Sequence, residues 1–312
     1  MLCGCASAST DRASSPPGGP SANWSPTPPR PRRTASPPGG SPSSGAPDAL
    51  TALAVIGQAT STIELGTAVI ATWPRHPLML AAQALTTAQL CPDRLVVGIG
   101  LAHKPTVEAT FRIPFARPAQ HMDEYLSILL PAMAHQPVDV TGATWSANAA
   151  GIGGPTDVPA PSVMLAAMGP RMLDLAGART DGTILWLSGP RTIATRLAPA
   201  LGAAAERAGR PAPRVVASVP VCVTDDPDRV RGLVAAILAD YNDLPSYREV
   251  MDVEGVDGPE GVSLIGDEDT VRAGLAAFAD AGTTDFSALE FVTNDDETVR
   301  TRTLLQSVAA EG

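Results

Sequence analysis

The chain has 312 residues and a formal net charge of −10, because 32 acidic residues outnumber 22 basic ones. This balance argues against a nucleic-acid-binding protein, since no basic face can be assembled from so few cations. Apolar residues make up 44% of the sequence, which is enough for one large core or two small ones. No apolar run approaches the length of a membrane span, so we expect no association with a membrane.

The cysteine pattern favours a reduced protein without a metal centre. Four cysteines form no CxxC pair and show no metal-ligand spacing with the four histidines: Cys3, Cys5, Cys91 and Cys222. We therefore expect a cytoplasmic location and no bound metal ion.

Residues 1–47 differ in composition from everything that follows them. Ser, Pro, Gly and Arg dominate this segment, which contains no Ile, Val or Phe. Such a sequence cannot bury enough apolar area to offset the entropy lost on ordering. We predict a disordered tail over residues 1–47 and one folded domain over residues 48–312.

Strand and helix patterns alternate through residues 48–312. Apolar runs rich in β-branched residues predict six strands, buried on both faces: 63–70, 95–99, 163–167, 183–187, 215–223 and 285–292. Apolar residues at helical spacing predict helices at 48–60, 77–91, 117–135, 170–178, 191–208, 227–241, 247–253, 268–281 and 297–308. Between them lie a short polar segment, 104–112, and a stretch without any period, 136–161. Strands that alternate with helices predict a parallel sheet.

One of these βαβ motifs resembles a known family. GTAV at 66–69, a proline-bounded loop, a helix and DRLVVGIG at 93–100 are similar to the third and fourth strands of the luciferase-like monooxygenase superfamily. The similarity extends through residues 164–192 and VCVTDD at 221–226, and is greatest to the actinobacterial branch that uses the deazaflavin coenzyme F420. It implies a (β/α)₈ TIM barrel over residues 48–312. This barrel is incomplete at its N-terminus, because only six of eight strands can be recognised.

In such barrels the active site lies where strands end and helices begin. The resemblance implies a bulge with a cis peptide bond at Ala68–Val69, which supports the deazaflavin ring from behind. From the residues alone, an ordinary buried strand end is the alternative. At the end of the next strand, Gly100 and its neighbouring glycine let a ligand approach the backbone. His103 falls near the position of a carboxylate proton donor in some relatives, and an imidazole there can protonate or hydrogen-bond a substrate. Its alternative is a polar loop residue.

The third strand-to-helix junction is suited to bind a phosphate. Met168, Gly169, Pro170 and Arg171 follow a strand and open a helix, whose first N–H groups have no partner within the helix. Glycine leaves room for a ligand, proline fits the first helical position, and arginine can add a charged hydrogen bond. The phosphodiester of F420 and the phosphate of flavin mononucleotide (FMN) fit this junction equally well.

The substrate pocket is indicated less directly. Trp73, His76 and Trp186 lie at strand ends and can line an apolar pocket, although a tryptophan packed in the core explains either indole as well. Sugar-phosphate dehydrogenases of the superfamily have a lysine near Pro190, so we do not expect a sugar phosphate as substrate. His121 and His135 are expected on a helix surface without a role.

The resemblance implies an oxidoreductase that transfers a hydride between coenzyme F420 and a small organic substrate. Two alternatives remain open. One is an FMN-dependent luciferase-like monooxygenase on the same scaffold, and the other is a non-catalytic barrel fragment, because missing strands would leave two sheet edges unpaired. Relatives commonly form homodimers, so the resemblance also implies a homodimer.

Overall fold

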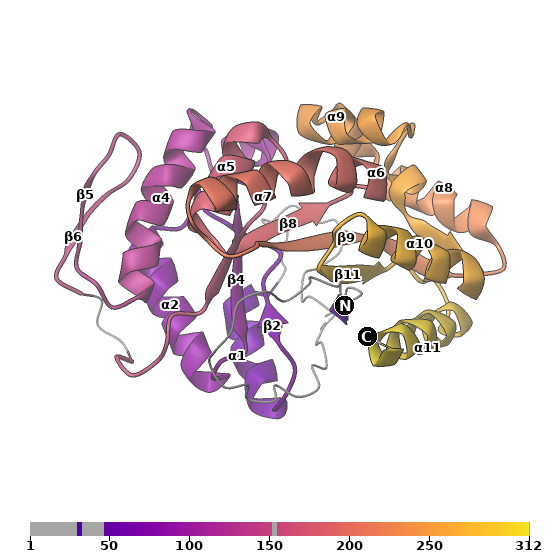
Figure 1. Cartoon of the computed structure of the whole chain (residues 1–312), viewed down its shortest axis with the longest axis horizontal. Coiled ribbons are helices and arrows are strands. Elements are labelled where there is room, and N and C mark those ends of the chain that lie inside the picture. The colour runs from indigo at the N-terminus through magenta and orange to yellow at the C-terminus, as the bar shows by residue number, and fades with distance from the viewer. Residues whose placement is uncertain (1–29, 33–46, 152–154, 312) are drawn as a thin grey trace.

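The computed structural model describes residues 30–32, 47–151 and 155–311 (Figure 1). Most of the predicted tail therefore lies outside the described residues, and its disorder stays a prediction. Within the tail the structure places a three-residue strand, β1 (Arg30–Arg32). This strand pairs in parallel with β11 (Asp285–Glu290).

Nine strands form one curled sheet in which every ladder is parallel, as expected for an α/β protein of the TIM-barrel type (Figure 1). The order along the sheet is β1-β11-β9-β8-β7-β4-β2, with β10 paired to β9 and β3 paired to β4. The six predicted strands are confirmed, and the first is divided in two. The remaining strands of this sheet are β2 (Leu65–Gly66), β3 (Ile70–Ala71), β4 (Leu95–Gly100), β7 (Ser162–Leu165), β8 (Gly182–Trp186), β9 (Arg214–Val223) and β10 (Leu264–Gly266).

Helices cover the outer face of the sheet (Figure 1). They confirm the predicted pattern: α1 (Ala49–Ala59), α2 (Pro77–Leu90), α4 (Pro118–Met133), α5 (Pro170–Arg179), α6 (Pro190–Thr192), α7 (Ala198–Arg207), α8 (Pro227–Ile237), α9 (Pro245–Glu254), α10 (Glu268–Asp280) and α11 (Asp295–Glu311). A π-helical turn at Ile193–Leu197 joins α6 to α7, so both belong to one continuous helix.

The structure also contains elements that the sequence did not predict. The polar segment after β4 forms a short helix, α3 (Lys104–Ala109), and the stretch without a period contains an antiparallel hairpin, β5 (Val138–Thr141) and β6 (Ser146–Ala149). Figure 1 shows this hairpin beyond α4, at the edge of the molecule. Both strands alternate between more and less exposed residues, but each has only four residues, and the less exposed positions of β6 are alanines, which have little preference for strands. A 3₁₀ turn at Ala239–Asp243 follows α8.

Two groups of residues close the base of the curled sheet. An apolar layer fills its interior: Val96, Met164, Ile184 and Val216, with Ala68 and Val69 packed against them. At the N-terminal ends of the strands, Arg214 donates two hydrogen bonds to Asp285, each 3.0 Å long, and contacts Glu64 at 2.8 Å. Glu64 directly precedes β2, whereas Arg214 begins β9. This ion pair therefore crosses the base of the sheet.

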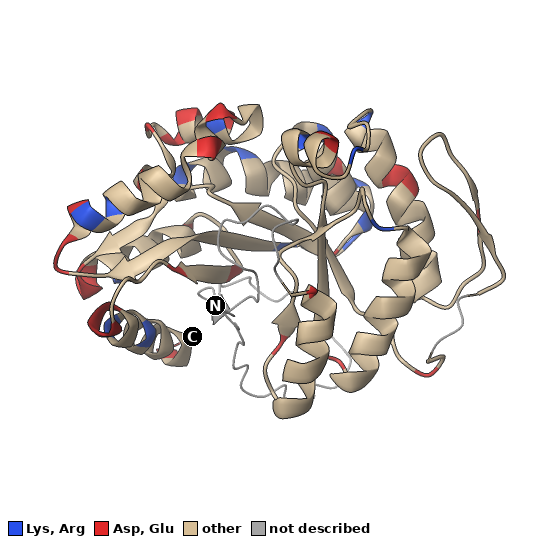
Figure 2. Cartoon of the chain, turned by 180° about the vertical axis from the view of Figure 1, so that it is seen from behind, with Lys and Arg blue, Asp and Glu red and all other residues tan. Residues whose placement is uncertain are grey.

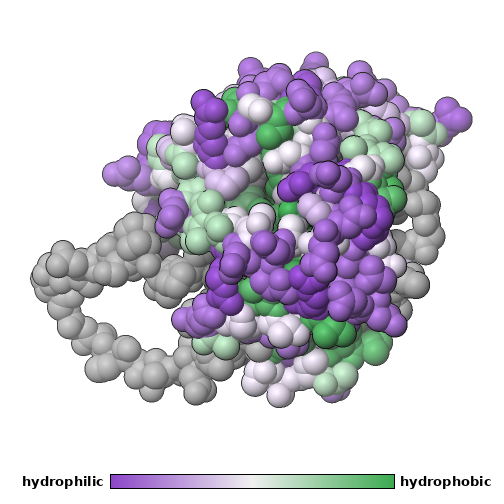
Figure 3. All heavy atoms as spheres, turned by 90° about the vertical axis from the view of Figure 1, so that its right-hand side faces the viewer, coloured by the Kyte–Doolittle hydropathy of each residue, from purple (hydrophilic) through white to green (hydrophobic). Residues whose placement is uncertain are grey.

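Charged residues are spread over the outer helices and the loops (Figure 2), and the side formed by α8 to α11 is mostly hydrophilic (Figure 3). Two neighbouring helices differ, because the sequences of α1 and α2 contain no charged residue at all. Within the described ranges, every helix is too short or too polar to cross a bilayer.

Candidate active site

The bulge between β2 and β3 has the predicted cis peptide bond. The Ala68–Val69 peptide is cis, and the Thr67 hydroxyl donates a 2.8 Å hydrogen bond to the carbonyl of Gly98 on β4. A side chain at Gly100 would come within 2.6 Å of Val69 Cγ2, and one at Gly98 would overlap the bulge. The bulge needs glycine at both positions of β4, because it fills the space that their side chains would occupy. This is a structural reason for the two glycines, beside the expectation that they let a ligand approach. Contact between Gly100 and a cofactor stays a prediction.

His103 lies between β4 and α3 and is surrounded by aromatic rings. The ring centroids of Tyr241 and Tyr247 are both 5.6 Å away, in edge-on contacts. Burial lowers the pKa of His103, which keeps the imidazole neutral at pH 7. The side chain makes no capping hydrogen bond to α3. A neutral imidazole without this local bond is available to accept or donate a hydrogen bond to another molecule.

The two tyrosines belong to the segment that crosses from α8 to α9. Tyr241 contacts Tyr247 edge-on at 4.7 Å and also approaches Trp186, at the end of β8, at 6.3 Å. Burial raises the pKa of Tyr241, and the nearby indole of Trp186 partly offsets that rise. Sequence patterns do not select either tyrosine, because their position beside His103 depends on a segment more than fifty residues after β8.

The predicted phosphate junction is open at the N-terminus of α5. No side chain caps this helix, and a Cβ placed on Gly169 would meet nothing within 4 Å. The Arg171 side chain is exposed and lines an outer groove of about 720 Å³ between α4, α5 and α7. Backbone N–H groups, which carry the positive end of the helix dipole, are thus the main anion donors here. Met168 approaches the Ser188 hydroxyl, whose oxygen lies 3.6 Å from its sulfur.

The helix that follows β8 is capped by a carboxylate from within the chain. Glu254 of α9 accepts hydrogen bonds from the backbone N–H groups of Arg191 (3.2 Å) and Thr192 (2.8 Å), and from the Thr192 hydroxyl (2.8 Å). A side chain on Gly189 would overlap this carboxylate. An internal anion therefore occupies the N-terminus of α6.

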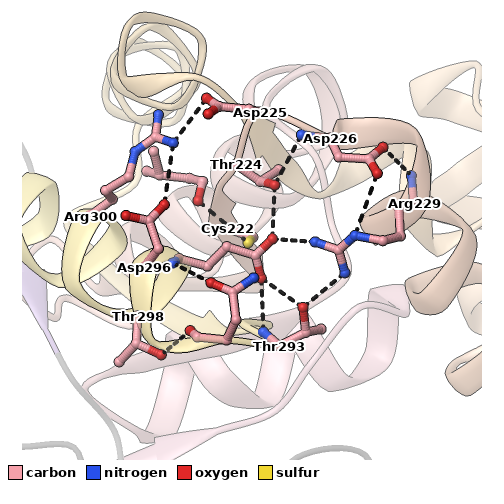
Figure 4. Close-up of polar contacts among 12 residues, drawn as sticks. Cys222, Thr224, Asp225, Asp226, Arg229, Thr293, Asp296, Thr298 and Arg300 are labelled. Atoms are coloured by element: carbon pink, nitrogen blue, oxygen red, sulfur yellow. Dashed lines mark hydrogen bonds and ion pairs between the residues drawn. The ribbon is translucent and has the colours of Figure 1, made fainter.

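The other helices that directly follow a strand at this rim are also capped, except for the short α3. Side chains cap α2, α8 and α10: those of His76, Asp226 and Asp267. At α11 the Asn294 side chain is the cap, because its Oδ1 accepts a 2.9 Å hydrogen bond from the backbone N–H of Glu297. Figure 4 also shows Thr224, Arg229 and Thr293 converging on one carboxylate, which belongs to Glu297. Burial alone would raise the pKa of Glu297, but hydrogen bonds from both threonines and the charge of Arg229 lower it to about 2. Among these helices, α5 is the long one whose N-terminus remains open.

Trp73, predicted for the substrate pocket, is packed in the core. Only 5% of its surface is exposed, and its ring stacks on His121 at 3.7 Å. His121 itself is fully buried, so its predicted position on a helix surface is wrong. The buried stripe of α4 begins at His121, one residue earlier than the apolar pattern indicated. His135 is partly buried at the end of α4, where its Nε2 lies 2.8 Å from the carbonyl of Val158.

His76 has a local structural function. Its Nδ1 accepts a 3.2 Å hydrogen bond from the backbone N–H of Leu78, which caps α2. Its ring also meets Trp145 of the hairpin edge-on at 5.3 Å. Roles of Trp73, His76 and Trp186 in binding a substrate stay predictions.

Residues 34–285 match the model of the luciferase-like monooxygenase family. The chain belongs to this family. Its members include oxidoreductases and monooxygenases that use F420 or a flavin.

Curated relatives of this luciferase-like chain are distant in sequence. It is 27% identical over 218 residues to an uncharacterised Mycobacterium tuberculosis protein, which covers 65% of the chain but only 64% of the relative. The chain therefore spans less than two thirds of that relative's length. It is 25% identical to the 5,10-methylenetetrahydromethanopterin reductase of Methanolobus tindarius, with 76% of each covered. A putative coenzyme F420-dependent oxidoreductase of Mycobacterium tuberculosis is 30% identical over 159 residues, or 46% of the chain and 45% of the relative.

Solved structures of luciferase-like enzymes have the same fold. An F420-dependent secondary alcohol dehydrogenase with a bound F420-acetone adduct gives a TM-score of 0.69 at 17% identity, covering 85% of this chain and 84% of that one. The FMN complex of a diketocamphane monooxygenase from Pseudomonas putida gives 0.64 at 20% identity, covering 86% and 83%. These likenesses establish the fold, and they include both cofactors.

Proposed function

We propose that this luciferase-like protein is an F420-dependent oxidoreductase that transfers a hydride between the deazaflavin and a small organic substrate. The observation that carries the proposal is the uncapped N-terminus of α5, because the comparable helix ends at this rim already hold side chains of the chain itself. Relatives support F420 over FMN: one is a putative F420-dependent oxidoreductase, and a tetrahydromethanopterin reductase of the same fold is F420-dependent. The FMN-dependent monooxygenase remains the alternative.

The residues at this rim fit such a cofactor. Backbone N–H groups at the start of α5 would hold its phosphate, and Ala68–Val69 would support its ring. The bound cofactor supplies the redox chemistry. His103, neutral at pH 7, would hydrogen-bond the oxygen of a substrate and donate or accept its proton. Trp186 and the two tyrosines beside His103 would exclude water from this position.

The proposal includes a homodimer in the cytoplasm. Helices α1 and α2 contact one another and have no charged residue, although the chain carries 54 charged residues in all, from 22 basic and 32 acidic ones. Two large apolar side chains on them are well exposed, Val55 (69%) and Met79 (66%). An uncharged face with exposed apolar residues is suited to pack against a second copy.

A substitution at Gly169 tests the phosphate site. The Gly169→Asp variant places a carboxylate at the N-cap of α5, where there is space for it, and we expect it to stabilise the helix while it competes with an anionic ligand. The matched control is Gly202→Asp on α7, which adds the same charge at an equally open position. F420 and FMN are titrated separately into the full chain and both variants, and binding is followed by fluorescence.

The titration separates the three functions. The proposal would be supported if the unchanged chain bound F420 but not FMN, and if F420 binding were at least tenfold weaker in Gly169→Asp and unchanged in Gly202→Asp. Binding of FMN alone would favour the monooxygenase. If a folded sample bound neither ligand, the chain would be a non-catalytic barrel fragment.

A further inference from the structure

Four residues form a continuous hydrogen-bonded chain from the hairpin to the candidate cofactor site. Trp145, in the turn of the hairpin, donates from Nε1 to Nδ1 of His121 at 3.1 Å. Nε2 of His121 lies 2.9 Å from the hydroxyl of Thr72, which follows β3. That hydroxyl lies 3.2 Å from the carbonyl oxygen of Gly100, the last residue of β4.

The direction of each hydrogen bond follows from the chemistry of the groups. An indole N–H can only donate, so Nδ1 of His121 must accept and carries no proton. The neutral imidazole therefore holds its proton on Nε2 and donates it to Thr72. The Thr72 hydroxyl then has its own proton left for the carbonyl of Gly100. A protonated imidazole would oppose the Trp145 donor, because both of its nitrogens donate.

The hairpin is fixed to α4 by a second set of contacts. The Glu124 carboxylate accepts three backbone hydrogen bonds from the turn, from Ala143 (3.0 Å), Thr144 (2.7 Å) and Trp145 (2.9 Å). These bonds hold the Trp145 indole edge-on against the His121 ring, with 5.6 Å between their ring centroids. The hairpin thus determines which nitrogen of His121 carries the proton.

We infer that His121 is a positioning residue, which transmits the placement of the hairpin to the backbone of Thr72 and Gly100 at the candidate cofactor site. His121 acts through Thr72 and touches no reacting group. The backbone N–H of Thr72 donates a 3.0 Å bond to the same Gly100 carbonyl, so the end of β3 is held to β4 twice. As far as it concerns a cofactor, this inference rests on the proposed function. The coupling itself can be measured without any ligand.

The test uses the full chain and four variants. Trp145→Phe keeps the ring but removes the donor, and Thr72→Val removes the hydroxyl at nearly constant volume. Thr72→Ser restores the hydroxyl and is the rescue. Ser146→Ala is the matched control, because it removes two hydrogen bonds that close the hairpin turn and leaves the Trp145 contact in place.

Two measurements are made on the ligand-free chain and one with F420. Nitrogen-15 NMR reports which ring nitrogen of His121 is protonated, and hydrogen exchange reports the protection of the Thr72 amide. We expect Trp145→Phe to lower that protection roughly fivefold and to mix the two tautomers, and Ser146→Ala to change neither. F420 binding should weaken about fivefold in Trp145→Phe and Thr72→Val, and should return to within about twofold in Thr72→Ser.

The outcomes separate this inference from the proposed function. An unchanged tautomer and unchanged Thr72 protection in Trp145→Phe would overturn the inference, whether or not F420 binds. A changed tautomer and protection in a chain that binds neither F420 nor FMN would support the coupling while the proposed function failed. Altered F420 binding in Ser146→Ala, equal to that in Trp145→Phe, would assign the effect to the hairpin as a whole and would also overturn the role of His121.

Discussion

The contact between the bulge and β4 predicts that Gly98 cannot be replaced even by alanine. A Cβ at this position would lie 2.5 Å from Ile184 Cδ1 and closer still to the carbonyl oxygen of Thr67, where ordinary contacts begin at 3.4 Å. The carbonyl belongs to Thr67, whose backbone N–H and hydroxyl are both hydrogen-bonded to β4, so it cannot turn away as the end of a flexible side chain would. Overpacking of this kind typically costs 1–3 kcal/mol, and we expect about 3 kcal/mol for Gly98→Ala.

Gly66 supplies the matched control for this prediction. It lies at the start of the same bulge, but a Cβ there would be 3.6 Å from its nearest neighbour, the carbonyl oxygen of Val96. We expect Gly66→Ala to change the free energy of unfolding by less than about 0.5 kcal/mol. Urea unfolding at pH 7 compares both variants with the unchanged chain. Equal midpoints for the two variants would refute the reasoning that the bulge fills the space above Gly98.

Two further predictions concern charge. Burial lowers the pKa of His121 from 6.5 to about 4, despite the opposing charge of Glu124, so the stabilisation by the neutral ring is complete above pH 6.5 and is lost as the pH falls toward 4. This lowering of the pKa corresponds to at most about 3.4 kcal/mol of stability. We expect His121→Gln to flatten the fall in the free energy of unfolding between pH 7 and pH 4.5. Parallel pH profiles for the variant and the unchanged chain would contradict this. Arg214→Met leaves Asp285 buried without its main cation, and we expect it to lower the free energy of unfolding in urea at pH 7 by about 3 kcal/mol. The Glu64 side chain is 27% exposed, so Glu64→Gln should lower it by less than about 1 kcal/mol. Equal losses would show that the ion pair between Arg214 and Glu64 contributes more than the one between Arg214 and Asp285.

Six of the parallel strands could be predicted because each is a buried apolar run followed by a helix with its own apolar stripe, whereas β1 and β10, with three residues each, are too short to be recognised. The cis bond at Ala68–Val69 was implied only by the family resemblance, since no physical rule selects that bond from its neighbours. The position of α5 followed from Gly169 and Pro170, which are local signals for a helix start. What single-sequence patterns could not supply were contacts between distant segments.

The residues around His103 and His121 illustrate this limit. Tyr241 and Tyr247 reach His103 from a segment about 140 residues later, and no local pattern relates them. Sequence analysis places His121 on a helix surface, and histidines are indeed seldom fully buried. Its burial depends on Trp145 and Thr72, which satisfy both ring nitrogens. A buried polar residue of this kind is recognisable only after its partners are placed.

The ion pair at the base of the sheet has a consequence for how the chain unfolds. In the described part of the chain, β2 and β1 are the two ends of the sheet, and no ladder joins them. The contact of Arg214 with Glu64 nevertheless ties the β2 side to β9 and β11 at the other side. That contact adds less than about 1 kcal/mol, so most of the coupling between the first and the last strands runs through the ladders that connect β2 to β9 by way of β4, β7 and β8. A substitution that breaks the Arg214–Glu64 pair should therefore lower the midpoint of unfolding slightly and leave a single transition.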